Sequence, residues 1–129
     1  MVESANTYVA VIDDDASVCR ALARLLRESG MHVVTYARGE EFLGDQKRPR
    51  FDCVLLDLQL ATVSGIDFQR QLAERGEVAP VIFITANDDP QSREQALRGG
   101  CVAYFRKTAP GEEILAAIRK AVAPKEGAL

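Results

Sequence analysis

Short apolar stretches rich in β-branched and aromatic residues alternate along the chain with longer segments in which apolar residues recur every three or four positions. This alternation is typical of α/β proteins, in which helices cover both faces of a parallel sheet. The sequence predicts five strands, which are YVAVI (8–12), HVVTY (32–36), FDCVLLD (51–57), PVIFIT (80–85) and VAYF (102–105).

The segments between the strands predict five helices with recognisable end signals. Asp15 and Ser64 are expected N-caps, and Asp89-Pro90 places a cap residue before a proline at the first helical position. The expected helices cover 16–29, 39–44, Ser64 to near Gly76, Pro90 to Gly99-Gly100, and a last one ended by Pro124. Their apolar stripes are Val18, Leu22, Leu25 and Leu26 in the first, Ile66, Phe68 or Gln69, and Leu72 in the third, and Ile114, Leu115, Ile118 and Val122 in the last.

Five β/α units predict one doubly wound domain, a five-stranded parallel sheet of order 2-1-3-4-5 with the flavodoxin-like (βα)5 fold. Residues 1–123 are expected to form this domain, and residues 124–129 a C-terminal tail or the start of a linker. In such sheets ligands bind beyond the carboxyl ends of the strands, at the switch point between strands 1 and 3.

Composition narrows the choice of partners and location. The 129 residues include 16 basic and 19 acidic ones, for a net charge of -3, so charge gives no reason to expect nucleic acid or membrane as the main partner. The longest apolar runs are about half of the ~20 residues that a membrane span needs. The N-terminus MVESANTY lacks the features of a signal peptide, so we expect a cytoplasmic protein.

Cysteine and histidine usage argues against a disulfide framework or a zinc site. Cys19, Cys53 and Cys101 are an odd number without CxxC spacing, and we interpret them as packing residues. The single histidine, His32, begins an apolar segment, and a structural role is expected for it.

Polar side chains stand at the ends of four predicted strands. Asp13 and Asp14 follow the first strand, Asp57 ends the third, Thr85 ends the fourth, and Lys107 comes two residues after the fifth. Polar residues commonly follow strands, which is a sufficient explanation for any one of these positions. Because the carboxyl ends of parallel strands meet at one edge of the sheet, however, we expect all five side chains to converge.

Such a set of side chains suits phosphoryl chemistry. Three neighbouring carboxylates repel one another unless a cation neutralises them, and oxygen ligands favour Mg²⁺, with Mn²⁺ as the alternative. A carboxylate beside that ion can attack phosphorus and form an aspartyl phosphate, while a lysine and a hydroxyl bind the other phosphoryl oxygens. Asp15 is not needed in this cluster, because an N-cap role explains it.

Four segments together resemble the receiver domains of bacterial two-component response regulators over residues 7 to about 123. They are VAVIDDDASVCRALARLLRESG, CVLLDLQLATVSGIDF, VIFITA and GGCVAYFRK. The resemblance implies a phosphorylation switch that receives a phosphoryl group from a histidine kinase or a phosphotransfer protein. Such a domain takes part in the catalysis of its own phosphotransfer and dephosphorylation without being a conventional enzyme.

The resemblance also implies a role for each site residue. Asp57 would accept the phosphoryl group, and the metal ligands would be Asp13 (through a water), Asp14, Asp57 and the backbone carbonyl of Gln59. Thr85 and Lys107 would contact the phosphoryl group, and Thr85 and Tyr104 would form the switch, with Ala86 leaving the site open and Gln59 and Asn87 tuning the phosphate lifetime. From spacing alone, Tyr104 is interpreted as a half-buried strand residue.

Two positions depart from the family pattern. Leu60-Ala61 replaces the usual Met-Pro, so the loop after Asp57 is expected to be more mobile. Thr108 stands where the family usually has a proline joined by a cis bond, and the next proline is Pro110. A cis bond to threonine would cost roughly 3 kcal/mol, so we predict a trans Lys107-Thr108 bond and a rearranged loop before the last helix.

Three other functions fit part of the sequence. Asp13 to Ser17 also matches the D-x-D-x-[ST] motif of haloacid-dehalogenase-type phosphatases, but these need a further acidic pair after the lysine, where only Glu112, Glu113 and Glu126 are found. A flavin-binding module would need a phosphate-cradling loop of Gly, Ser and Thr after the first strand, where this chain has three acids instead. A degenerate receiver, acting as a protein-binding module without phosphorylation, would require the two loop departures to be disabling.

The expected output surface comprises helix 4, strand 5 and helix 5, which carry mixed charge and would suit a partner or a homodimer. An ordinary solvated surface explains the same charges. No DNA contact by this domain itself is expected. The stretch GMHVVTYARGEEFL is similar to receivers of LuxR-type transcriptional regulators, so the chain is interpreted either as a single-domain regulator or as the receiver of a longer protein.

Overall fold

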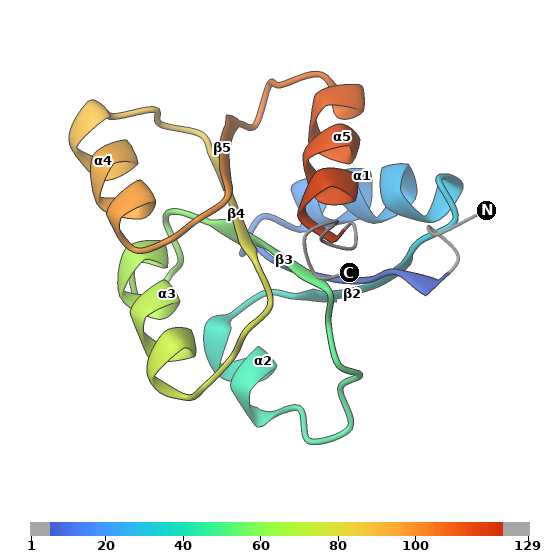
Figure 1. Ribbon diagram of the computed structural model, residues 1–129, viewed down its shortest axis with the longest axis horizontal. Helices are drawn as coiled ribbons and strands as arrows, with labels where there is room; N and C mark the ends of the chain where they lie inside the picture. Colours follow the sequence, from blue (N-terminus) through green and yellow to red (C-terminus); the bar gives the residue numbers. More distant parts are fainter. Residues whose placement is uncertain (1–5, 123–129) are drawn as a thin grey trace, which may run out of the picture.

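The β-branched and apolar runs form five parallel strands in the computed structural model, which describes residues 6–122 (Figure 1). The strands are β1 (Tyr8–Ile12), β2 (His32–Tyr36), β3 (Cys53–Asp57), β4 (Val81–Thr85) and β5 (Ala103–Arg106). They pair in the order β2-β1-β3-β4-β5. The predicted doubly wound sheet is therefore confirmed.

Five helices connect the strands and cover both faces of the sheet. They are α1 (Ala16–Glu28), α2 (Gly39–Gly44), α3 (Gly65–Glu74), α4 (Pro90–Arg98) and α5 (Gly111–Val122). Helices α1 and α5 lie on one face, and α2, α3 and α4 lie on the other (Figure 1). The helix α4 is the least embedded of these, because Ala96 is its single buried residue.

The alternation of side chains along each strand divides the core into two apolar layers. In β3, for example, Leu55 packs with α1 and α5, whereas Leu56 packs with α2 and α3. Residues of β3 and β4 are buried throughout, as expected for central strands that helices cover on both sides. These two strands and β1 are neighbours in the sheet and end at its carboxyl edge.

The predicted helix starts are confirmed by their caps. The Asp15 carboxylate accepts hydrogen bonds from the backbone N–H groups of Ser17 and Val18. Ser64 Oγ accepts from the N–H of Asp67, and Asp89 caps α4 directly before Pro90. Each cap starts a helix a few residues after the carboxyl end of a strand, so the loops that border the site are short.

Several predicted boundaries were wrong by one or two residues. β3 begins at Cys53 instead of Phe51, β4 at Val81 instead of Pro80, β5 covers 103–106 instead of 102–105, and α1 ends at Glu28 with Ser29 as its C-cap. Pro80 has no N–H group for the sheet ladder. At Asp52 the backbone N–H donates to the Tyr8 carbonyl (2.7 Å), but the Tyr8 N–H donates to the Asp52 carboxylate (2.8 Å) instead of to a backbone carbonyl. The predicted helix stop at Pro124 and the tail 124–129 lie outside the described residues.

Candidate functional site

The three predicted carboxylates lie together at the carboxyl edge of the sheet. One oxygen each of Asp13, Asp14 and Asp57 lies within 4.8 Å of the others. The pairing of β1 with β3 brings them together, since Ile12 and Leu56, the residues directly before Asp13 and Asp57, are opposite each other in the register. Asp13 and Asp57 are buried, at 2% and 4% exposure, while Asp14 is exposed and leaves the cluster open to solvent.

Lys107 supplies positive charge to this cluster. Its Nζ lies 3.0 Å from Asp13 Oδ2 and 3.5 Å from Asp57 Oδ2. Burial by itself would lower the pKa of Lys107, but the hydrogen bond to Asp13 and the charge of Asp57 raise that pKa overall. The Lys107-Thr108 peptide bond is trans, as predicted, so the replacement of the usual proline does not prevent the lysine from reaching the carboxylates.

The buried carboxylates need more cation than Lys107 provides. Burial raises the pKa of Asp57 to about 6, and the charge of Asp13 raises it too, while the hydrogen bond from the Gln59 N–H (3.1 Å) and the Lys107 charge act in the opposite direction. Asp13 Oδ2 is buried and accepts no hydrogen bond of good geometry within residues 6–122. Lys107 is thus its ion-pair partner at 3.0 Å, and a hard divalent cation with oxygen ligands fits the remaining negative charge of the three adjoining carboxylates.

The loop from Leu58 to Ser64 closes tightly over the end of β3. Gln59 and Ser64 form an isolated antiparallel bridge, and the Gly65 N–H donates to the Leu58 carbonyl (2.7 Å). A Cβ at Gly65 would lie 2.4 Å from the Asp57 carbonyl oxygen, so glycine allows the close approach of α3. The metal-ligand role of the Gln59 carbonyl and the mobility of this loop remain predictions.

Thr85 is fully buried at the end of β4, next to β3 in the sheet. Its hydroxyl donates to the Asn87 carbonyl (2.9 Å) and accepts from the Asn87 N–H (3.0 Å). Thr85, Ala86 and Lys107 line one cavity of about 400 Å³ at this edge. The structure thus brings Thr85 and Lys107 to a common cavity, with the Thr85 hydroxyl bonded within its own turn.

Tyr104 lies in β5 and packs against the core beside Phe83, with a ring-centroid distance of 6.3 Å. Its side chain is partly buried and its hydroxyl oxygen is shielded from solvent, without a hydrogen-bond partner in the described part of the chain. Burial, and secondarily the charge of Asp88, raise the pKa of Tyr104. The half-buried position expected from spacing is confirmed, while its switch role remains a prediction.

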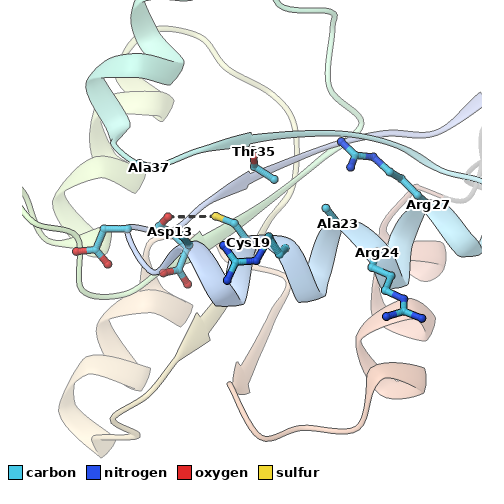
Figure 2. A pocket seen from close by; sticks show the side chains of 10 residues that line it. Asp13, Cys19, Ala23, Arg24, Arg27, Thr35 and Ala37 are labelled. Carbon is cyan, nitrogen blue, oxygen red and sulfur yellow. Dashed lines mark hydrogen bonds between the residues drawn. The ribbon is translucent and has the colours of Figure 1, made fainter.

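A second hollow, of about 380 Å³, adjoins the acid cluster on the side of α1 and β2 (Figure 2). Asp13 and Cys19 lie at one end of it, and the Cys19 thiol donates to the Asp13 carbonyl oxygen (3.2 Å). Burial raises the pKa of the Cys19 thiol, which therefore stays protonated. Cys53 and Cys101 are buried as well, so the prediction that all three cysteines are packing residues is confirmed.

Two contacts near the site were not predicted from the sequence. The Thr62 hydroxyl donates to Glu40 at the start of α2 (2.9 Å), and Asp88 pairs with both Arg93 and Arg106. Thr62 and Glu40, and likewise Asp88 and Arg106, are 22 and 18 residues apart and are brought together by the fold, so no spacing along the chain signals these two pairs.

A doubly wound α/β sheet with two buried carboxylates, a lysine and a hydroxyl at its carboxyl edge defines a class of phosphoryl-accepting signalling domains. The chain belongs to the response regulator receiver domain family, whose model matches residues 9–119. This membership excludes the phosphatase and flavin-module alternatives.

Individual proteins that are similar to this chain are response regulators as well. The chain is 38% identical to the response regulator protein TodT of Pseudomonas putida over 116 residues, which are 90% of this chain and 51% of TodT. A receiver crystal structure from Burkholderia phymatum is 43% identical, with a TM-score of 0.79, 92% of this chain covered and 97% of that one. A Burkholderia pseudomallei response regulator, crystallised with a phosphorylated aspartic acid, calcium ion and citrate, is 27% identical, with a TM-score of 0.79 and coverage of 91% and 69%.

The chain is therefore a receiver domain, a signalling module controlled by phosphorylation. Receiver domains are phosphorylated by histidine kinases and bind Mg²⁺ in an acidic pocket. The chain spans about half the length of the curated relatives it matches. Within residues 6–122, none of the helices has the length and apolar character needed to cross a membrane.

Proposed function

We propose that Asp57 accepts the phosphoryl group and that Asp13, Asp14, Asp57 and the Gln59 carbonyl hold the divalent ion, Mg²⁺ or alternatively Mn²⁺. The observation that supports this assignment best is the contact of Lys107 with the buried Asp13 and Asp57, at 3.0 Å and 3.5 Å. When bound, the ion supplies charge neutralisation for the carboxylates and for the incoming phosphoryl oxygens.

In the proposed transfer an Asp57 carboxylate oxygen attacks phosphorus. An O–P bond to Asp57 forms as the P–N bond to the donor histidine breaks, and the imidazole leaves with the bonding electron pair. Lys107 and Thr85 bind phosphoryl oxygens, and the small Ala86 keeps the approach open. Hydrolysis reverses the state, because water attacks phosphorus, inorganic phosphate leaves and the Asp57 carboxylate is restored.

The donor is a histidine kinase or a phosphotransfer protein, and the output surface consists of α4, β5 and α5. Phosphorylation draws the Thr85 hydroxyl to the phosphoryl group and lets the Tyr104 side chain turn inward. The populations of the conformations of this surface then change. That surface serves a protein partner or a homodimer and makes no nucleic acid contact itself. We propose that the domain works in the cytoplasm, as the receiver of a longer regulator in which another domain provides the transcriptional output.

The test is intact-mass analysis of the protein after incubation with acetyl phosphate, with and without Mg²⁺. A Mg²⁺-dependent phosphoryl adduct is expected in the wild type and in Asp67→Asn, which removes an exposed acid of α3, and no adduct is expected in Asp57→Asn. If the wild type forms no adduct and beryllofluoride with Mg²⁺ also fails to bind, the degenerate, phosphorylation-independent receiver is the correct description.

A further inference from the structure

Asp88 joins three elements beside the site. It lies in the turn between β4 and α4, and its side chain is 12% exposed. It accepts from Arg93 Nη2 of α4 and from Arg106 Nε of β5, the latter at 3.2 Å. Two cations therefore neutralise one half-buried carboxylate, and the turn is attached to a helix and to an edge strand at the same time.

The turn from Thr85 to Asp88 is connected to β5 at both of its ends. Arg106 lies opposite Thr85 in the parallel register, and the Lys107 N–H donates to the Thr85 carbonyl (2.8 Å). Asn87 lies between Thr85 and Asp88 in the chain. The Asn87 N–H donates to the Thr85 hydroxyl, and the Asn87 carbonyl accepts from the same hydroxyl. Asp88 then contacts β5 through Arg106, so movement of the turn away from β5 would break this ion pair.

Arg93 extends the same set of contacts to Tyr104. Its guanidinium carbon lies 5.2 Å from the centroid of the Tyr104 ring while it also pairs with Asp88. The arginine therefore contacts the aromatic residue of the switch and the acid that holds the turn. Movement of the turn away from Arg93 would change the environment of Tyr104.

We propose that Asp88 is a positioning residue that controls Thr85. Its ion pairs with Arg93 and Arg106 hold the turn 85–88 in the conformation in which the Thr85 hydroxyl bonds Asn87, and this conformation competes with binding of a phosphoryl group. The inference rests on the proposed function, since it concerns how readily the same site accepts its ligand. Binding of a phosphoryl group must shift the turn to another conformation, so weaker ion pairs mean tighter binding.

The expected effect follows from the exposure of the partners. The side chains of Arg93 and Arg106 are 50% and 66% exposed, so each pair contributes modestly. Asp88→Asn keeps the shape of the side chain and removes its charge. We expect it to tighten Mg²⁺-dependent binding of beryllofluoride, a phosphoryl analogue, about three- to tenfold.

The experiment is a beryllofluoride titration of the whole chain at saturating Mg²⁺, followed by the NMR signals of the Thr85 and Tyr104 amides. The variants are Asp88→Asn, Arg106→Gln and the double variant, with Asp88→Glu as the conservative rescue. Arg98→Gln is the matched control, because it removes an exposed arginine of α4 that pairs with Glu94. Affinity for Mg²⁺ alone is measured for each variant and is expected to stay constant.

Tighter binding in Asp88→Asn and Arg106→Gln, without full additivity in the double variant and with Asp88→Glu near the wild type, supports the proposal. Unchanged or weaker binding in Asp88→Asn, or an equal change in Arg98→Gln, overturns it while the proposed function stands. A wild type that binds no beryllofluoride with Mg²⁺ overturns both.

Discussion

Replacing Asp57 with asparagine is expected to stabilise the folded protein above about pH 6 when divalent cations are absent. Burial raises the pKa of Asp57 from 3.8 to about 6, so the folded state binds this proton more tightly than the unfolded chain does. The folded wild type therefore loses stability as the pH rises from about 4 to about 6, and well below pH 4 the carboxyl is neutral in both states. Asparagine carries no such charge and keeps the oxygen that accepts from the Gln59 N–H.

The size of the effect follows from the pKa. The difference between 3.8 and about 6 corresponds to about 3 kcal/mol in the free energy of unfolding, at roughly 1.4 kcal/mol per pKa unit. That figure is an upper bound for two reasons. The cluster is open to water where Asp14 is exposed, and relaxation of the surroundings reduces the cost of ionising Asp57. We therefore expect Asp57→Asn to be more stable than the wild type by about 1–2 kcal/mol at about pH 8 and nearly equal at about pH 4.

The assay is urea unfolding in the presence of a chelator at a series of pH values, with Asp67→Asn as the exposed-acid control. Added Mg²⁺ should narrow the gap at about pH 8, because it stabilises the folded wild type by binding. Equal unfolding midpoints for Asp57→Asn and the wild type at about pH 8 would refute the reasoning. A gap that stays constant from about pH 4 to about pH 8 would refute it as well, since it would not come from ionisation of Asp57.

Two further substitutions test how the loops beside the sheet are built. Gly65→Ala should lower the free energy of unfolding by about 3 kcal/mol, because its Cβ would meet the Asp57 carbonyl oxygen at 2.4 Å. Gly44→Ala is the control, because a Cβ there meets no atom within 4 Å, and it should leave the urea unfolding midpoint unchanged. Arg48→Met should cost about 1–2 kcal/mol, because the guanidinium donates to the Phe42 carbonyl (2.8 Å) at the end of α2 and lies 4.4 Å above the Phe42 ring. An unchanged unfolding midpoint in either Gly65→Ala or Arg48→Met would contradict the contact invoked for it.

Much of the fold and of the acid cluster could be predicted, because both depend on patterns that are local in the sequence. The apolar runs specify strands, and the geometry of parallel sheets then places every strand end at one edge, so Asp13, Asp57 and Lys107 could be predicted to meet. The caps Asp15 and Ser64 were equally accessible, since a cap depends on residues within one helical turn.

The contacts of Asp88 could not be predicted in this way. They depend on Arg106 lying opposite Thr85, on the path of α4, and on the rotamers of two long side chains. From the sequence, the charges of this surface, Arg93 and Arg106 among them, could be interpreted either as a partner surface or as an ordinary solvated one. Both side chains are indeed exposed, but neither interpretation includes their common partner Asp88. Strand boundaries were missed for a related reason, since ladder pairing at Asp52 and Pro80 depends on hydrogen bonds made with other strands.

The parallel register also limits how the chain can tolerate changes in length. Side chains alternate between the faces of the sheet, so one inserted or deleted residue in β3 would turn Asp57 to the opposite layer and separate it from Asp13. An insertion in the loop 45–52, at the amino end of β3, leaves that alternation intact. The acid cluster therefore tolerates length variation before β3, at the amino edge of the sheet, and excludes it within the strand itself.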